Sequence, residues 1–146
     1  MQKFKSIFFS LVLLATAFSC AKTTDVNPNE VNFAINLIGL GEVPATASAA
    51  TGTFTAVYNK STKILKFKIN YAGMTPTAWH IHKGATNATG AVIYSLGTTY
   101  TNGFEGQTVA FTVEQETDLL AGSYYVNYHS ALFASGEIRG QLLRTL

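Results

Sequence analysis

The chain has 146 residues, of which 47% are hydrophobic and 12% are charged, with a formal net charge of +2 and a single cysteine. This length fits one globular domain, and the nearly balanced charge gives no electrostatic reason to expect nucleic acid as a partner. A single cysteine also excludes an intramolecular disulfide and a four-cysteine zinc site.

Residues 1–19 have the layout of a secretory signal peptide. Lys3 and Lys5 precede an apolar run over residues 7–15, and small residues follow that run. The run is much shorter than the roughly 20 apolar residues of a membrane-spanning helix. We therefore expect the segment to be removed on export, and the loss of its two lysines leaves eight basic residues against eight acidic ones.

Cys20 follows the signal segment directly. A bacterial lipoprotein has its acylated cysteine at this place, and Ala17, Phe18 and Ser19 before it resemble a lipobox. Two or three fatty chains on Cys20 would anchor the protein stably. The alternative is a plain secretory signal with an incidental cysteine. We expect an exported protein that is lipid-anchored to the bacterial cell envelope, at the outer membrane or the cell surface, with residues 20–30 as the lipidated tether.

From residue 31 onward, hydrophobic and polar residues alternate with the period of two that is typical of half-buried strands. Residues 65–71 are the clearest case, and Asn102-Gly103 is a strong signal for a tight turn. In chain order, the predicted strands cover residues 31–38, 52–58, 65–71, 79–82, 92–96, 107–112 or 107–113, 123–129 and 137–143.

One segment departs from the strand pattern. Residues 112–115 have the Thr-x-x-Gln form of a helix capping box, and Gly122 is a stop signal, so a helix of about two turns is expected between them. Short, evenly spaced strands without long helices predict an all-β domain over residues 31–146. Its expected architecture is an antiparallel Greek-key sandwich or barrel of seven to eight strands with one short helix.

The three histidines of the chain all belong to predicted strands. His80 and His82 are two residues apart, so they project from the same face of an extended chain about 7 Å apart. Trp79 and Ile81 would then face the core, and His129 lies at the end of a later strand. Neutral imidazole suits zinc and copper, and three histidines leave an open position on the ion. One hypothesis is therefore a metal site made of His80, His82 and His129.

The alternative is a structural network of hydrogen bonds around the same histidines. Polar residues that share their strand faces would support it: Asn127, Glu137, Arg139 and Gln141. Simple exposure of the histidines is a third interpretation. These alternatives stay open at the level of the sequence.

The sequence offers no catalytic set, which favours a non-enzymatic protein. It has no Gly-x-Ser-x-Gly elbow, no phosphate-binding loop and no His-Glu-x-x-His motif. Tyr124, Tyr125 and Tyr128, with Trp79, offer a stacking surface for sugar or peptide, although aromatic residues in strands more often pack in the core.

Five segments, in the order in which they occur, resemble the CHRD domain: residues 41–44 (Gly-Glu-Val-Pro), 79–84 (Trp-His-Ile-His-Lys-Gly), 90–92 (Gly-Ala-Val), 120–129 and 136–142. That family is named for repeats in chordin, an extracellular antagonist of bone morphogenetic proteins, and single domains of this kind occur in secreted bacterial proteins. The resemblance covers about residues 31–143 and implies an extracytoplasmic β-domain. The expected function is a membrane-anchored binding or structural module for an unknown protein or glycan, with copper or zinc binding as the alternative.

Overall fold

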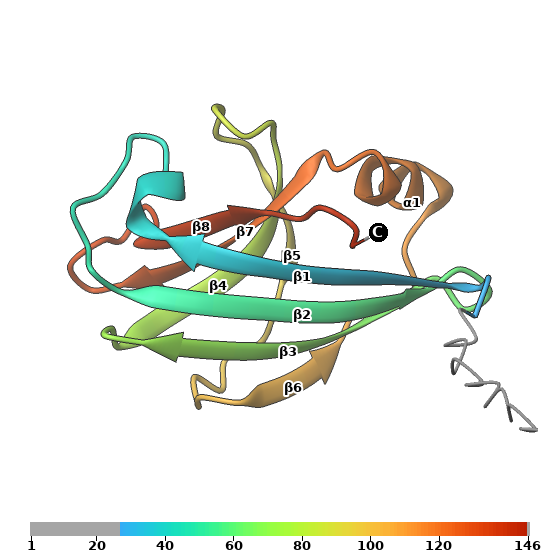
Figure 1. The fold of residues 1–146 in the computed structure, drawn as a ribbon, viewed down its shortest axis with the longest axis horizontal. Coiled ribbons are helices and arrows are strands. Elements are labelled where there is room, and N and C mark those ends of the chain that lie inside the picture. The colour runs from blue at the N-terminus through green and yellow to red at the C-terminus, as the bar shows by residue number, and fades with distance from the viewer. Residues whose placement is uncertain (1–26, 146) are drawn as a thin grey trace, which may run out of the picture.

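The computed structural model describes residues 27–145. The predicted signal peptide and Cys20 lie outside these residues. Figure 1 shows the order and arrangement of the elements, which are β1 (Glu30–Ile38), η1 (Gly39–Gly41, a 3-10 turn), β2 (Thr51–Asn59), β3 (Ile64–Ala72), β4 (Pro76–Lys83), β5 (Val92–Ser95), β6 (Phe104–Gln107), α1 (Val113–Leu120), β7 (Tyr124–Ser130) and β8 (Ile138–Gln141).

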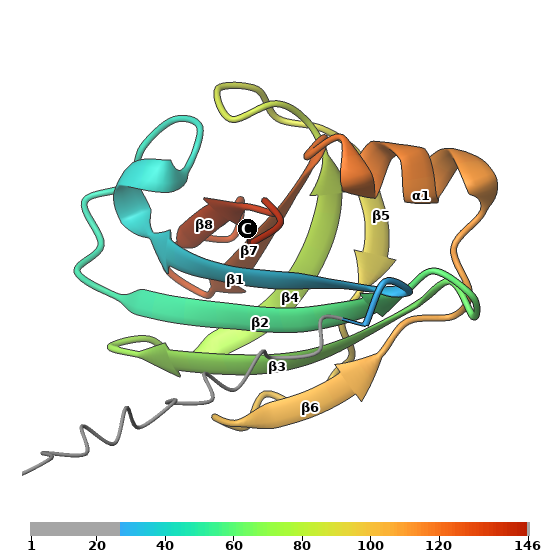
Figure 2. The ribbon, with the colours of Figure 1, turned by 45° about the vertical axis from the view of Figure 1, so that its right-hand side comes forward.

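The eight strands form a single antiparallel sheet in the order β5-β4-β7-β8-β1-β2-β3-β6. The sheet is strongly curled, so that β4 and β5 lie behind β1, β2 and β3 (Figure 2). The two edge strands, β5 and β6, lie near each other but do not pair through their backbones in the described structure. They are joined by a side chain, because the Tyr94 hydroxyl of β5 donates to the carbonyl oxygen of Gln107 in β6 at 3.2 Å. The result is a half-barrel, which confirms the predicted all-β fold class with one short helix.

The hydrophobic core fills the concave side of the sheet. Trp79 lies at its centre, fully buried, with its ring centroid 5.1 Å from Tyr100, 5.7 Å from Tyr128 and 5.8 Å from Phe104. Ile81 on the same strand is also fully buried. The prediction that Trp79 and Ile81 face the core is confirmed.

All four aromatic residues of the candidate stacking surface are buried: Trp79, Tyr124, Tyr125 and Tyr128. They therefore serve as packing, and no aromatic platform of these residues is open to a sugar or peptide.

The predicted helix is present as α1, which closes one open end of the half-barrel. The Thr112 side chain accepts a hydrogen bond from the Gln115 backbone at 3.1 Å, and the Gln115 side chain accepts from the Thr112 backbone at 2.9 Å. This is the predicted capping box. Leu119 is the residue of α1 that reaches the core, and Phe111 before the helix packs against Tyr58. Among the described residues, no helix has the length and apolar character needed to cross a membrane.

The strand predicted over residues 107–113 is wrong, because the strand in this region is β6, which follows the turn at Asn102-Gly103 at once. The ladder with β3 ends at Thr108, whose hydroxyl replaces a backbone carbonyl as the acceptor for the Leu65 N–H at 3.1 Å. The last strand is also shorter than predicted. After β8 the chain turns, with the Leu143 N–H donating to the backbone carbonyl oxygen of Gln141 at 3.0 Å, and Arg144 then bridges to Phe33 of β1.

Candidate metal centre

The three histidines meet on the convex face of the sheet, on two neighbouring strands. His80 and His82 project from β4 on the side opposite Trp79 and Ile81, and His129 projects from β7. One ring nitrogen from each histidine lies within 4.8 Å of the other two. The structure therefore brings together the full set that the sequence singled out.

Two of the rings are oriented by backbone carbonyls. His82 Nδ1 lies 3.0 Å from the carbonyl oxygen of Gly90, and His129 Nδ1 lies 3.0 Å from that of Ala134. A carbonyl oxygen can only accept, so both Nδ1 atoms carry the proton, and in a neutral ring Nε2 then has a free lone pair. Hydrogen bonding of the remote nitrogen to a carbonyl is the usual way in which proteins orient metal-binding histidines.

The inward-facing nitrogens are not equally satisfied. His129 Nε2 can accept a hydrogen bond from His80 Nδ1 at 3.1 Å, while Asn127 Oδ1, itself an acceptor, lies 3.0 Å from the same nitrogen. His82 Nε2 is buried and has no hydrogen-bond partner among the described residues. Buried polar nitrogens are seldom left without a partner, so this atom is the best indication that the cluster holds a ligand.

Burial favours the neutral form of His80 and His82. Burial first, and the neighbouring rings of His129 and His82 second, lower the pKa of His80 to about 4. Burial also lowers the pKa of His82, although its hydrogen bond with Gly90 acts in the opposite direction. Neutral imidazole is the form that binds metal. His80 is the half-buried member of the set, whereas His82 and His129 are each 8% exposed, so solvent reaches the cluster beside His80.

Aromatic stacking fixes the ring of His82 from the side of β7. Its centroid lies 4.9 Å from that of Tyr125, with an interplanar angle of 4°. Tyr125 in turn contacts the guanidinium of Arg139, which is nearly fully buried on β8. Arg139 Nη2 donates to the carbonyls of Ala85 and Ala88 at 2.7 and 3.0 Å, so it holds the β4–β5 loop over the cluster.

The four residues expected to support the histidines have different positions. Asn127 contacts His129 directly, while Arg139 acts through Tyr125. Gln141 Nε2 donates to the carbonyls of Gly84 and Gly122 at 3.0 and 2.8 Å and so fixes the loop ends. Glu137 does not join the histidines, because its carboxylate accepts a hydrogen bond from Ser48 at 2.7 Å at the end of the sheet.

Glu42 is a member of this region that the sequence did not single out. It is buried beside Asn127 and Arg139, and its Oε1 has no hydrogen-bond partner within residues 27–145. Burial raises the pKa of Glu42, and the contacts with Asn127 and Arg139 partly offset that rise. Glu42 lies in a loop far from the histidines in sequence, and the Gly-Glu-Val-Pro segment that contains it contributed only to the resemblance to the CHRD domain.

One family model, that of the CHRD domain, matches residues 33–142. All three histidines, Glu42, Asn127 and Arg139 fall within this range. Comparisons with curated proteins and with solved structures gave no significant match.

Proposed function

The chain belongs to the CHRD domain family, and on that premise we propose that it is an exported, envelope-anchored module that binds one Zn²⁺ or Cu²⁺ ion through His80, His82 and His129. The observation that carries the proposal is the buried Nε2 of His82, which has no hydrogen-bond partner in the described part of the chain and lies close to two other imidazoles. A bound ion would have one open coordination position, as three-histidine sites do.

The donor set fits such an ion. Each histidine offers one nitrogen within 4.8 Å of the others, and carbonyl contacts from Gly90 and Ala134 fix two of the rings. The lowered pKa of His80 keeps its ring neutral at physiological pH, so no proton competes with the ion there.

A second candidate function is a binding or structural module in which the histidines only stabilise the fold. The contact between His129 Nε2 and His80 Nδ1 favours it, because a hydrogen bond donated by His80 satisfies the His129 ring without a metal. In that case the biological ligand is a protein or glycan bound elsewhere on the domain.

Export and anchoring are the second part of the proposal. They rest on the signal layout of residues 1–19 and on the place of Cys20 directly after it. The described chain begins at Asn27, next to the start of β1, where Lys60 N–H donates to the Asn29 carbonyl oxygen. A tether at this end leaves the opposite end of the sheet facing away from a membrane.

The metal proposal is tested by purifying the protein without a histidine tag and measuring its metal content and its melting temperature with Zn²⁺, Cu²⁺ or EDTA. The test variant is the double substitution His80→Ala, His82→Ala. The matched control is Lys66→Ala, Lys68→Ala, two exposed residues with the same spacing on β3.

We expect one ion per chain and a rise of several degrees in melting temperature, because an ion at 100 times its Kd stabilises the fold by about 2.7 kcal/mol. The control variant keeps this shift and the histidine variant loses it. Absence of metal and of any shift in the unmodified protein would overturn the proposal in favour of the structural network.

A further inference from the structure

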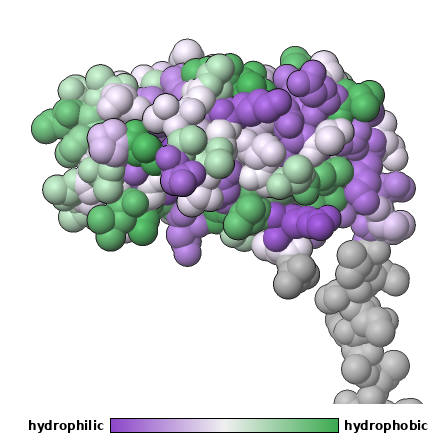
Figure 3. All heavy atoms as spheres, turned by 90° about the horizontal axis from the view of Figure 1, so that it is seen from above, coloured by the Kyte–Doolittle hydropathy of each residue, from purple (hydrophilic) through white to green (hydrophobic). Residues whose placement is uncertain are grey.

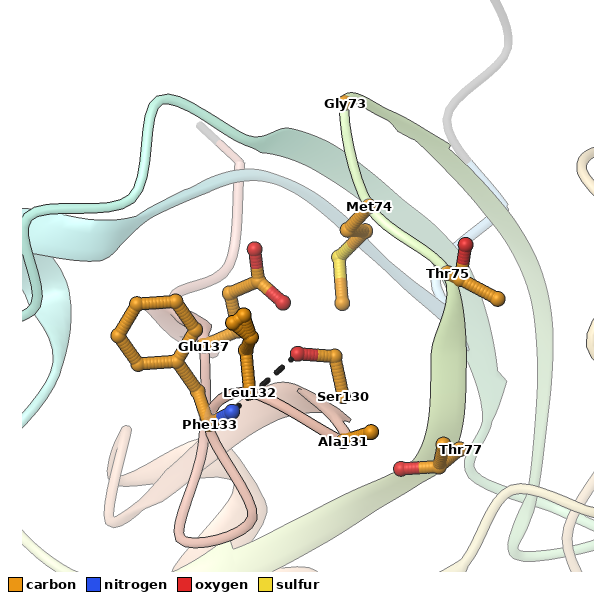
Figure 4. Close-up of a pocket in the computed structure, with 9 residues that line it drawn as sticks. All are labelled: Gly73, Met74, Thr75, Thr77, Ser130, Ala131, Leu132, Phe133 and Glu137. Atoms are coloured by element: carbon orange, nitrogen blue, oxygen red, sulfur yellow. Dashed lines mark hydrogen bonds between the residues drawn. The ribbon is translucent and has the colours of Figure 1, made fainter.

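A cavity of about 610 Å³ lies at the end of the sheet, away from the histidines. Figure 4 shows that it is formed between the turn that joins β3 to β4 and the loop that joins β7 to β8. None of the three histidines lines it, so its function is independent of the metal proposal. Cavities of this volume are within the range that holds small ligands.

The charged group that lines this cavity is the carboxylate of Glu137. The residue is only 5% exposed, and among the described residues its carboxylate accepts one hydrogen bond, from the Ser48 hydroxyl. None of the ion pairs formed within residues 27–145 includes Glu137. A buried carboxylate without a cation is costly, and natural proteins normally pair such a group.

The walls around the carboxylate are largely apolar. Met74, Leu132 and Phe133 supply hydrophobic surface, and Figure 4 shows Met74, Ser130 and Phe133 around the carboxyl group of Glu137. Leu132 is 76% exposed, so it leaves the mouth of the cavity with unpartnered apolar surface. A ligand that fits both features has one positive charge on a short apolar stem.

We propose that this cavity binds an alkylammonium group, with Glu137 as the counter-charge and Met74, Leu132 and Phe133 as the contact for the stem. An ammonium group has three donors and no acceptor, which suits a carboxylate whose remaining lone pairs are free. Apolar walls favour the methylene stem and strengthen the ion pair by excluding water.

The cavity lies at the end of the sheet away from the proposed tether, which agrees with a ligand that reaches the protein from the side away from the membrane. β1 begins beside the tether and ends at Ile38, next to Thr51 and hence to the β3–β4 turn. β1 is nine residues long, so its two ends are about 26 Å apart. Hydrophobic surface gathers at the left-hand end of the molecule in Figure 3, the end that carries η1 in Figure 1.

The proposal is tested by titrating the purified protein with n-butylammonium chloride and following backbone amide resonances by NMR. Neutral n-butanol is the reference ligand of nearly equal size. The test variant is Glu137→Gln, which keeps an acceptor for Ser48, and the matched control is Glu105→Gln, an exposed carboxylate on β6.

We expect saturable shifts at Met74, Ser130 and Phe133, with an affinity for n-butylammonium about tenfold higher than for n-butanol. Glu137→Gln removes that preference, and Glu105→Gln keeps it. Equal affinity for the two ligands, or an unchanged preference in Glu137→Gln, would overturn the proposal.

A second variant keeps the test valid where Glu137→Gln does not fold. Thr77 is an exposed residue that lines the same cavity, so Thr77→Lys places an ammonium group there while leaving Glu137 intact. It should lower the affinity for n-butylammonium about tenfold, and an unchanged affinity would count against the site.

A blocked lysine, N-acetyl-lysine N-methylamide, distinguishes the two sources of an alkylammonium group. Binding of this probe with the affinity of n-butylammonium assigns the cavity to a lysine side chain of a partner protein. Its exclusion, with n-butylammonium still bound, assigns it to a free amine. A failure of the metal proposal changes neither result, because the histidines do not line the cavity.

Discussion

Arg139 lies with its guanidinium carbon 3.3 Å from the centroid of the Tyr125 ring, and both side chains are buried. Because β7 lies between β4 and β8, the same ring also contacts His82 from the other neighbouring strand. Tyr125 therefore connects a buried cation with a histidine of the candidate metal centre, and this stack is central to the convex face.

Removing the Tyr125 ring should be far more damaging than removing its hydroxyl. Tyr125→Ala leaves a cavity and loses the contact with Arg139, so we expect a loss of about 3 kcal/mol or more in the free energy of unfolding. Tyr125→Phe loses only the hydrogen bond from the Gly90 N–H and should cost about 1 kcal/mol. Urea unfolding measures both, and equal losses would show that the stack contributes little.

Gly136 is a position where any side chain would collide with the buried side chains of Glu42 and Asn127. It has a φ of +135°, and a Cβ there would contact Glu42 Oε1 and lie 2.7 Å from Asn127 Nδ2. Gly97 also has a positive φ, but its Cβ would make only ordinary contacts with Phe104. We expect Gly136→Ala to cost about 1–3 kcal/mol more than Gly97→Ala, because only the first adds a steric clash to the backbone strain.

Metal affinity separates these two glycine variants as well. Displacement of Asn127 in Gly136→Ala should weaken zinc binding, since Asn127 contacts His129, whereas Gly97→Ala should bind as the unmodified protein does. Calorimetric titration of both variants gives the comparison, and equal affinities would mean that Asn127 does not position His129.

The metal-free protein should lose stability as the pH falls from about 6.5 to about 4. The pKa of His80 is lowered from 6.5 to about 4 in the folded state, so between these values the unfolded chain takes up a proton that the folded chain does not. The lowered pKa of His82 acts in the same direction. The raised pKa of Glu42 acts in the opposite direction, because its contribution is lost as the pH rises above its usual 4.5.

Melting temperatures measured in EDTA between pH 7.5 and pH 4 test this dependence. The double variant His80→Ala, His82→Ala should show a flatter profile over the range between pH 6.5 and pH 4. Parallel profiles for the two proteins would assign the acid sensitivity to other groups.

Cys20→Ser should release the protein from the membrane fraction, since a serine at this position cannot receive the thioether-linked lipid. Ser19→Ala is the matched control, because alanine keeps a small residue before the cysteine and should leave the protein anchored. Fractionation followed by immunoblotting distinguishes the two. A Cys20→Ser protein that stays with the membranes would contradict the lipid anchor.

Much of the local structure could be predicted because it depends on neighbouring residues. Alternation along residues 65–71 predicted β3, and the capping box at Thr112 predicted α1. The same period of two placed His80 and His82 on the face opposite Trp79. The alternation failed as a guide for residues 107–113. There the pairing of β6 with β3 ends at Thr108, whose hydroxyl accepts from the N–H of Leu65, a residue far away in the chain.

Only the tertiary structure decided which distant segments meet. Pairing of β4 with β7 brings His129 to His80, and pairing of β7 with β8 brings Arg139 to Tyr125. Glu137 and Arg139 share a strand pattern in the sequence, yet Glu137 lines a cavity at the end of the sheet while Arg139 lies beside the histidines. Periodicity fixes the face on which a side chain lies, whereas the partner across that face depends on strand order, which is set by the packing of the whole core.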